Sequence, residues 1–447
     1  MRNAARRAER VSSTVLQDIV VHSLSHDGRG IARVEGKTVF VAGALPGERV
    51  NARLERQRRD FDEARVADIL EAAPERVTPR CAHFGVCGGC SLQHLAPAAQ
   101  LAAKQQTLLD NLQHIGQVQP DTLLPPQPGP VWGYRRRARL SARYVHAKRR
   151  VLVGFVERGK PFITDTRHCD ILDPHVGALI EPLSVLLGSL GIAAQVPQVE
   201  LAVGDRHTVL VLRVLSEPDA QDRQRLAEFE QAHGVHIYLQ SGKPDALEPL
   251  SGQRVPLGYA LPEWGVELEF EPADFIQINA AMNRSLIARA LELLACEASH
   301  RVLDLFCGLG NFTLPLARVA AEVTGVEGDP GLIRRARLNA ERNGIANARF
   351  QHADLFADPG AAPWAHSQYD RILLDPPRAG AREVITHFDR FNAGSVVYVS
   401  CHPATLARDA AQLVREQGYR LRAAGVLDMF PHTAHVESIA LFERSGT

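Results

Sequence analysis

The second half of the chain alternates between short apolar runs and longer segments with helical periodicity, which constrains the fold more than any other feature. We expect strands over residues 301–305, 322–327, 371–375, 395–400 and 438–443, and helices at about 280–295, 311–320, 329–342 and 403–417. Strands that alternate with helices form a parallel, doubly wound sheet, whose ligands lie at the carboxyl ends of its strands. The fold class is therefore α/β, with a Rossmann-like domain over residues 266–447.

Two further domains are expected before it. Five short alternating runs fall at residues 15–22, 30–34, 38–42, 49–54 and 64–70, and glycines separate them. Such a pattern predicts an OB-like β-barrel over residues 13–72, preceded by a disordered basic arm at 1–12. Residues 73–265 are predicted to form a mixed α/β central domain. Its expected helices lie at 97–115, 175–190 and 220–232, its strands at 151–156, 199–203 and 209–214, and its proline-rich connection at 117–130.

Charge is balanced overall but uneven locally. The chain has 51 basic and 51 acidic residues, and no apolar stretch long enough to span a membrane. No hydrophobic segment follows the basic start, so we expect a cytoplasmic protein without a secretory signal. From Tyr134 to Arg150 there are eight Lys or Arg and no Asp or Glu. On a strand these would line one face, which favours RNA phosphate binding; the alternative is a solvated strand face.

A glycine turn marks a nucleoside site. Gly308 and Gly310 lie in the segment Asp304 to Asn311, between an expected strand and helix, and lack the Gly-x-Gly-x-x-Gly spacing of dinucleotide sites. Glu327 ends the next strand, where a carboxylate can accept from ribose hydroxyls, and Asp354 follows a third. This spacing favours S-adenosylmethionine over NAD. The alternative is an α/β domain with glycine loops and no cofactor.

A cysteine at a strand end suggests group transfer through a covalent sulfur intermediate. Cys401 follows the run at 395–400 and precedes a helix, whose dipole we expect to lower its thiol pKa. Glu437 is the candidate base, and His432 and His435 are weaker ones. The alternative for Cys401 is a buried structural cysteine, while the rival thiol Cys307 is expected to pack.

The loop after another strand narrows the chemistry. Asp375 to Arg378 reads Asp-Pro-Pro-Arg, similar to the acidic-Pro-Pro-aromatic loop of amino-group methyltransferases. Arg378 replaces the aromatic residue that would stack a flipped adenine. The loop therefore argues against adenine methylation and leaves carbon methylation open. Methylating C5 of uracil needs an activated thiol that adds to C6, a base for the C5 proton, and donors for the charge on O4.

Four of the seven cysteines are candidate metal ligands: Cys81, Cys87, Cys90 and Cys169. An odd number of cysteines argues for metal binding or catalysis over disulfides. Four thiolates suit either a [4Fe–4S] cluster or zinc. Three clustered ligands with a distant fourth favour iron–sulfur, because zinc ribbons pair their ligands. With no iron left open, a structural role is expected; the alternative is scattered thiols.

Together these motifs resemble the bacterial 23S ribosomal RNA uracil-C5 methyltransferases of the RumA/RlmD type, which are class I S-adenosylmethionine-dependent RNA methyltransferases. The resemblance covers nearly the whole chain and implies that the barrel is a TRAM domain and that the segment 274–279 approaches cofactor and substrate. It implies cofactor contacts from Gln277, Phe306, Asn311, Glu327, Asp354 and Asp375. It also implies Cys401 as nucleophile, Glu437 as base, and a [4Fe–4S] cluster on Cys81, Cys87, Cys90 and Cys169.

The expected function is therefore methylation of C5 of one uridine in 23S rRNA through a covalent Cys–C6 adduct, by a monomer without a protein partner. Two alternatives stay open. One is the same chemistry on transfer RNA, although relatives acting on transfer RNA are expected to lack the barrel and the cluster. The other is a non-catalytic iron–sulfur module that binds RNA.

Overall fold

The computed structural model describes residues 14–242, 246–360 and 362–444. The predicted arm at 1–12 lies outside these residues. The chain divides into two compact units, which we call unit 1 (Met1–Ala103 and His432–His435) and unit 2 (Lys104–Pro431 and Val436–Thr447). The domain boundaries at 72 and 265 stay predictions. In the described part of the chain, no helix combines the length and hydropathy needed to cross a membrane.

Unit 1 contains a closed five-stranded barrel, as the alternating runs predict. Its strands follow the order β1-β2-β3-β5-β4. They are β1 (Val15–Leu24), β2 (Gly30–Val34), β3 (Lys37–Ala42), β4 (Arg49–Gln57) and β5 (Phe61–Glu71). Inward-facing aliphatic side chains, among them Val21, Val39 and Val50, fill the interior. Gly30 is required here because a Cβ would lie 2.7 Å from Cγ1 of Val21.

A helix and an extended segment follow the barrel. The helix α1 (Pro97–Asn111) continues into a short π-helix, η1 (Leu112–Gly116). Within the proline-rich connection, two residues form a strand that the sequence pattern did not predict, β6 (Thr122–Leu123), which pairs in parallel with β20 (Tyr419–Leu427). The connection approaches closely because Gly425 has no side chain: a Cβ there would lie 2.7 Å from Cβ of Leu124.

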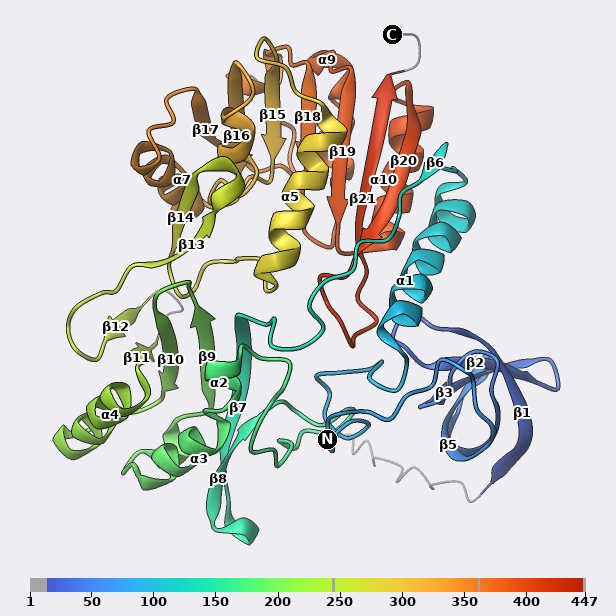
Figure 1. Ribbon diagram of the computed structural model, residues 1–447, viewed down its shortest axis with the longest axis vertical. Coiled ribbons are helices and arrows are strands. Elements are labelled where there is room, and N and C mark those ends of the chain that lie inside the picture. The colour runs from blue at the N-terminus through green and yellow to red at the C-terminus, as the bar shows by residue number, and fades with distance from the viewer. Residues whose placement is uncertain (1–13, 243–245, 361, 445–447) are drawn as a thin grey trace, which may run out of the picture. The chain divides into compact units, whose positions relative to one another are not determined.

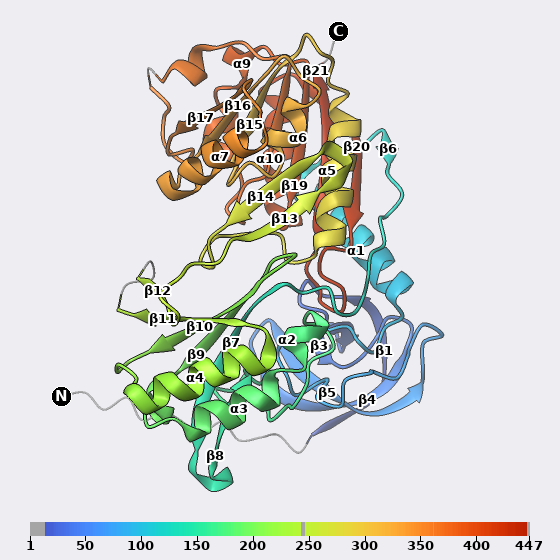
Figure 2. The ribbon, with the colours of Figure 1, turned by 60° about the vertical axis from the view of Figure 1, so that its left-hand side comes forward.

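The central segment forms a six-stranded sheet in the order β12-β11-β10-β9-β7-β8. Helices α3 and α4 lie side by side on one face of it (Figure 2). The strands are β7 (Arg137–Val145), β8 (Arg150–Gly154), β9 (Gln198–Val203), β10 (Thr208–Val214), β11 (His236–Ser241) and β12 (Leu247–Pro249). The helices are α2 (Pro174–Gly177), α3 (Ile180–Ser189) and α4 (Ala220–His233), with short 3₁₀ turns η2 (His146–Lys148) and η3 (Ala193–Gln195). A hairpin, β13 (Leu257–Leu261) and β14 (Val266–Phe270), follows and encloses the 3₁₀ turn η4 (Pro262–Trp264).

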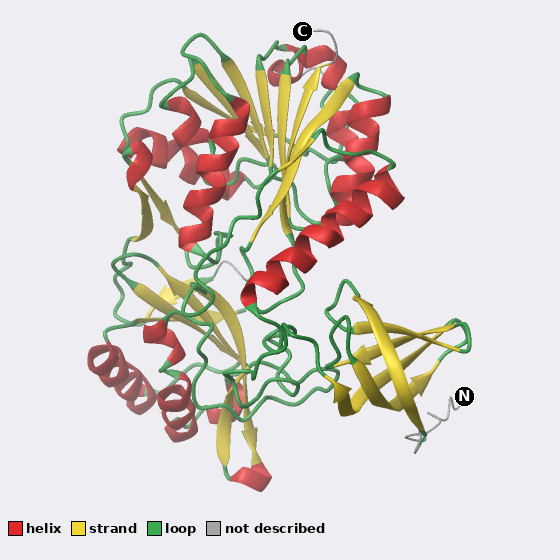
Figure 3. Cartoon of the chain, turned by 45° about the vertical axis from the view of Figure 1, so that its right-hand side comes forward, coloured by secondary structure: helices red, strands yellow, loops and turns green. Residues whose placement is uncertain are grey.

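The last part of the chain forms the doubly wound sheet, in the order β17-β16-β15-β18-β19-β21-β20-β6, with helices on both faces (Figures 1 and 3). Its other strands are β15 (Arg301–Leu305), β16 (Glu322–Glu327), β17 (Ala348–His352), β18 (Arg371–Leu374), β19 (Ser395–Ser400) and β21 (Glu437–Arg444). Its helices are α5 (Ala280–Leu294), α6 (Thr313–Ala317), α7 (Pro330–Arg342), α8 (Arg382–Ile385), α9 (Phe388–Phe391) and α10 (Pro403–Arg415), with the 3₁₀ turn η5 (Pro363–His366).

The direction of β21 explains how distant residues meet. The strands β17, β16, β15, β18 and β19 are parallel, so their carboxyl ends share one edge of the sheet. β21 runs antiparallel to β19, with Ser438 opposite Ser400. The first residue of β21, Glu437, therefore lies at the same edge as the residue that follows β19, Cys401. Topology alone brings the two candidate catalytic residues together.

Candidate active site

Cys401 lies between β19 and α10. His402 caps α10, its Nδ1 accepting a hydrogen bond from the amide of Thr405 at 3.3 Å, and Pro403 begins the helix. Although the thiol lies at a helix start, its pKa is raised, first by burial and then by the nearby carboxyl groups of Glu437 and Asp375. Arg378 opposes them, lowering the pKa through its charge and a hydrogen bond to the thiol. The expectation that the helix start would lower the thiol pKa was wrong, because burial, and after it the carboxyl groups of Glu437 and Asp375, raise that pKa.

Glu437 is almost completely buried at the start of β21. Burial raises the pKa of its carboxyl well above the usual value, and Asp375 raises it further. Asp375 follows β18, and burial raises its pKa to about 7. Cys401, Glu437, Asp375 and Arg378 thus form one electrostatically coupled group at the sheet edge. A buried carboxyl group with a raised pKa beside a thiol is a suitable pair for moving protons once a substrate changes the balance.

Two other titratable residues lie in the strand and turn next to this group. Asp304 is inaccessible to solvent, and its Oδ2 accepts a hydrogen bond of 2.5 Å from Thr313. Burial, followed by the charges of Asp375 and Glu327, raises its pKa to about 8. Cys307 belongs to the hydrophobic core, and burial raises the pKa of its thiol well above the usual value. It packs, as expected, and is unsuited to be the nucleophile.

The turn after β15 has the geometry of a ligand loop. Gly308 and Gly310 have φ of +57° and +98°, and Phe306 takes the same left-handed region at +64°, which is strained for a side chain of its size. The carboxylate of Glu327 joins this turn to the next one. It accepts hydrogen bonds from the amide of Gly308 at 3.1 Å and from that of Asp329 at 3.0 Å. Its remaining lone pairs are suited to two ribose hydroxyls.

The other predicted cofactor residues differ in how firmly hydrogen bonds fix their side chains. Asn311 and Asn283 exchange two amide hydrogen bonds of 2.9 Å, and Tyr259 also donates to Asn311 at 2.9 Å. Asp354 is exposed two residues beyond the end of β17, and its Oδ1 accepts from the amide of Phe356 at 2.9 Å. Gln277 is partly buried in the loop before α5.

The predicted metal ligands lie in both units. Cys81, Cys87 and Cys90 share a turn-rich segment of unit 1, whereas Cys169 belongs to unit 2. All four thiols are partly exposed, and the amide of Gly89 donates to Sγ of Cys87 at 3.4 Å. Within residues 14–242, 246–360 and 362–444, no three His, Cys, Asp or Glu side chains are grouped as a metal site. The donor chemistry of four thiols fits a cluster.

The basic segment forms β7 with the expected alternation, since Ala138, Leu140 and Ala142 are buried between its arginines. However, Glu200 on β9 pairs with Arg139 at 3.0 Å and with Arg137 at 3.7 Å. The face is therefore less cationic than the sequence alone indicates. Arg143 is exposed on the same face.

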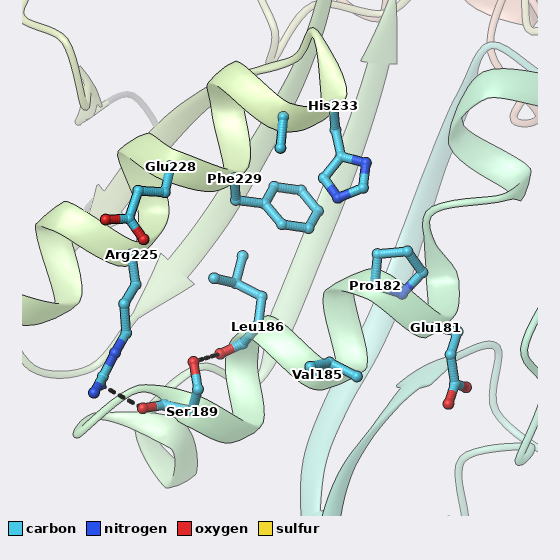
Figure 4. A pocket seen from close by; sticks show the side chains of 10 residues that line it. Glu181, Pro182, Val185, Leu186, Ser189, Arg225, Glu228, Phe229 and His233 are labelled. Atoms are coloured by element: carbon cyan, nitrogen blue, oxygen red, sulfur yellow. Dashed lines mark hydrogen bonds between the residues drawn. The ribbon is translucent and has the colours of Figure 1, made fainter.

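A shallow groove of about 570 Å³ lies between α3 and α4 (Figure 4). Leu186, Phe229 and Val185 provide its apolar surface, and Arg225, which also lines it, donates to the carbonyl of Ser189 at 2.5 Å. None of the candidate catalytic, cofactor or metal residues lines this groove, so it is separate from the active site.

One buried ion pair was not predicted. Lys104 on α1 and Asp428 are both almost completely buried, with Nζ 2.6 Å from Oδ1, and Nζ also donates to the carbonyl of Phe430 at 2.9 Å. These contacts hold the loop that leads to Glu437. The weaker base candidates lie further along that loop: His432 is buried, with its Nδ1 3.1 Å from Nε2 of Gln100, and His435 is exposed. Lys104 and Asp428 are 324 residues apart in the chain, so a single sequence gives no sign that they form a pair.

Two family models match the chain: "TRAM domain" over residues 16–67 and "Methyltransferase domain" over residues 297–427. A solved tRNA (uracil-54, C5)-methyltransferase of Pyrococcus abyssi, in complex with S-adenosyl-L-homocysteine, is 24% identical, with a TM-score of 0.71. The match covers 95% of this chain and 99% of that one, more than a protein without the barrel could cover. The expectation that transfer RNA relatives lack the barrel was wrong for this relative. The fold and the two family models define a methyltransferase with a TRAM barrel.

Full-length relatives define the family more narrowly. The "23S rRNA (uracil(1939)-C(5))-methyltransferase RlmD" of Stenotrophomonas maltophilia strain R551-3 is 53% identical over 98% of this chain and 100% of its own length. The RlmD of Xanthomonas axonopodis pv. citri is 51% identical over the same shares. The chain belongs to the RlmD family of 23S rRNA (uracil-C5)-methyltransferases.

Proposed function

We propose that this protein transfers the methyl group of S-adenosylmethionine to C5 of one uridine in 23S rRNA, at the position that corresponds to uracil 1939 in the names of its relatives. The observation that carries the proposal is the group formed by the Cys401 thiol, the buried carboxyl of Glu437 and the guanidinium of Arg378 at the carboxyl edge of a methyltransferase sheet. A ribosomal RNA substrate implies that the protein acts in the cytoplasm. A monomer carries all of the proposed catalytic residues.

Cys401 is proposed as the nucleophile. Its thiolate forms a bond to C6, the electrons of the C5–C6 double bond move toward O4, and C5 takes the methyl group from the sulfonium, releasing S-adenosylhomocysteine. Glu437, as carboxylate, then removes the C5 proton, the double bond re-forms and the thiolate leaves. Arg378 favours the thiolate through its charge, in opposition to burial. The target base must leave its stack, because the thiol needs one face of the ring.

The cofactor residues are proposed from the predicted set. Glu327 would accept from the ribose hydroxyls, and Asp354, exposed at the next strand end, would accept from the adenine amino group. Phe306, whose ring centroid lies 5.7 Å from that of Phe356, offers an aromatic wall. Gln277, Asn311 and Asp375 would bind the amino acid end. Asn311 has little freedom, since Asn283 and Tyr259 engage its amide.

Cys81, Cys87, Cys90 and Cys169 are proposed to hold a [4Fe–4S] cluster with a structural role. Four thiolates match the ligand number of such a cluster, and the hydrogen bond from Gly89 to Cys87 is of the type that stabilises cluster sulfur. No step of methyl transfer passes through this group. The TRAM barrel and Arg143 of β7 are proposed as RNA contacts.

Mapping of 5-methyluridine in total RNA tests the proposal. In a strain without the gene, the methyl group is expected to disappear from one site of 23S rRNA and to return with the wild-type gene, while 5-methyluridine in transfer RNA stays unchanged. Loss from transfer RNA alone would favour the alternative substrate. Unchanged methylation in both RNAs, with cofactor binding retained, would favour the non-catalytic module.

A further inference from the structure

The loop that carries Asp375 and Arg378 is anchored to the helix that follows Cys401. Asp409 of α10 is inaccessible to solvent, and its Oδ2 accepts hydrogen bonds of 2.7 Å from the amide of Ala381 and from the hydroxyl of Tyr398. Its Oδ1 accepts from Nε of Arg408 at 2.7 Å. One buried carboxylate therefore joins the end of the loop, strand β19 and helix α10.

Arg408 adds a second attachment to the same loop. Its Nη2 donates to the carbonyl of Ala379 at 2.8 Å and lies 2.6 Å from Oδ1 of Asp409. Gly380, between the two attached residues, has a φ of +87°, and a Cβ there would lie 2.4 Å from Nη2 of Arg408 and 2.5 Å from Oδ2 of Asp409. The loop backbone therefore lies directly on the ion pair, with no room for a side chain.

Burying a carboxylate costs free energy unless hydrogen bonds satisfy its oxygen atoms. A fully satisfied hydrogen-bond network also fixes the geometry of the elements that it connects. Here the joined elements carry the two sides of the active site: Arg378 comes three residues before Ala381, and Cys401 comes eight residues before Asp409. Arg378 is the group that lowers the pKa of the Cys401 thiol against burial and two carboxylates.

We propose that Asp409 is a positioning residue: through its anchor on residues 379–381 it holds the Arg378 guanidinium beside the Cys401 thiol. The proposal rests on Cys401 as the nucleophile of the proposed function. Asp409 itself does not touch substrate. It acts through Arg378, so its effect on the thiol should vanish when Arg378 lacks its charge.

The test uses the full-length protein without RNA. The rate of iodoacetamide alkylation at Cys401 is followed by peptide mass spectrometry from pH 6 to pH 10 in four proteins: wild type, Asp409→Asn, Arg378→Met and the double variant. An asparagine has only one oxygen, so it can accept either from Ala381 and Tyr398 or from Arg408. Its NH₂ group then faces the remaining donor and cannot accept a hydrogen bond from it. The exposed Asp389→Asn of α9 is the matched control and should react like wild type.

We expect Asp409→Asn to shift the alkylation profile to higher pH and to slow the reaction at pH 7.5 about three- to tenfold, as a pKa rise of half to one unit would. In the Arg378→Met background the same change should alter the rate less than about 1.5-fold. An equal slowing in both backgrounds, or none in either, would overturn the proposal.

A second variant tests the proposal if Asp409→Asn does not fold. Arg408→Gln keeps the buried carboxylate and removes the Ala379 attachment at a partly exposed position, and it should shift the profile in the same direction. An unshifted profile in folded Arg408→Gln contradicts the anchor. Because the assay needs no RNA, these shifts could appear even if the protein methylated nothing, which would refute the proposed function alone.

Discussion

Asp304, the fourth residue of β15, should make the free energy of unfolding depend on pH in a direction opposite to that of most carboxylates. Its pKa is raised from 3.8 to about 8 by burial and by neighbouring carboxylates. The folded protein therefore holds a proton that the unfolded chain releases above pH 4. The stabilising effect is complete below about pH 4 and is lost as the pH rises to about 8. At about 1.4 kcal/mol for each pKa unit, the loss amounts to about 5–6 kcal/mol across this window.

Asp304→Asn removes the titration and keeps an oxygen that can accept from Thr313. Urea unfolding at pH 5, 6, 7, 8 and 9, followed by tryptophan fluorescence, measures the free energy of unfolding of both proteins; Trp364 lies buried in the same domain. The difference, variant minus wild type, should rise by about 1.4 kcal/mol per pH unit up to pH 8 and then level off. A difference that stays constant with pH would refute the reasoning, and Asp389→Asn provides the exposed control.

Three further predictions concern the site. Glu437→Gln should leave ordinary substrate RNA covalently attached, seen as a slow band on a denaturing gel, with product release slowed at least about 100-fold; normal turnover would exclude Glu437 as the base. Because the pKa of the Cys401 thiol is raised, the single-turnover methylation rate should rise about tenfold per pH unit near neutrality; a flat profile between pH 7 and 9 would contradict a thiolate-limited step. Purified Cys169→Ser should lose iron and brown absorbance while Cys296→Ser keeps both; equal iron content in the two variants would exclude Cys169 as a ligand.

The sequence predicts most strands of the doubly wound sheet, because the periodicity of hydrophobic residues and the glycine turns are both local signals. The strands β15 and β16 fall at the predicted residues, and the expectation of a strand after Glu437 is confirmed. The strand β6 was missed because two exposed residues are too few to show a hydrophobic alternation. Its pairing also depends on Gly425, which lies about 300 residues away in the chain.

Electrostatics could not be predicted in the same way. A helix start beside Cys401 is visible in the sequence, but the burial of the thiol and the two nearby carboxyl groups, which together raise its pKa, are not. Asp375 follows β18 and Glu437 begins β21, and only the sheet order brings them together. The ion pair of Lys104 with Asp428 and the anchor formed by Asp409 depend likewise on tertiary contacts. Arg378 was noticed in the sequence for what it replaces, and the structure adds that it acts on the Cys401 thiol.

The central claim is a transient bond between Cys401 and C6 of uracil, and a suicide substrate tests it most directly. A 23S rRNA fragment with 5-fluorouridine at the target should form a stable adduct with the wild-type protein and S-adenosylmethionine, because fluorine cannot leave C5 as a proton. Mass spectrometry should place the RNA on Cys401, and Cys401→Ala should form no adduct and no product. Methylation by Cys401→Ala at an undiminished rate, or an adduct on another residue, would contradict the account.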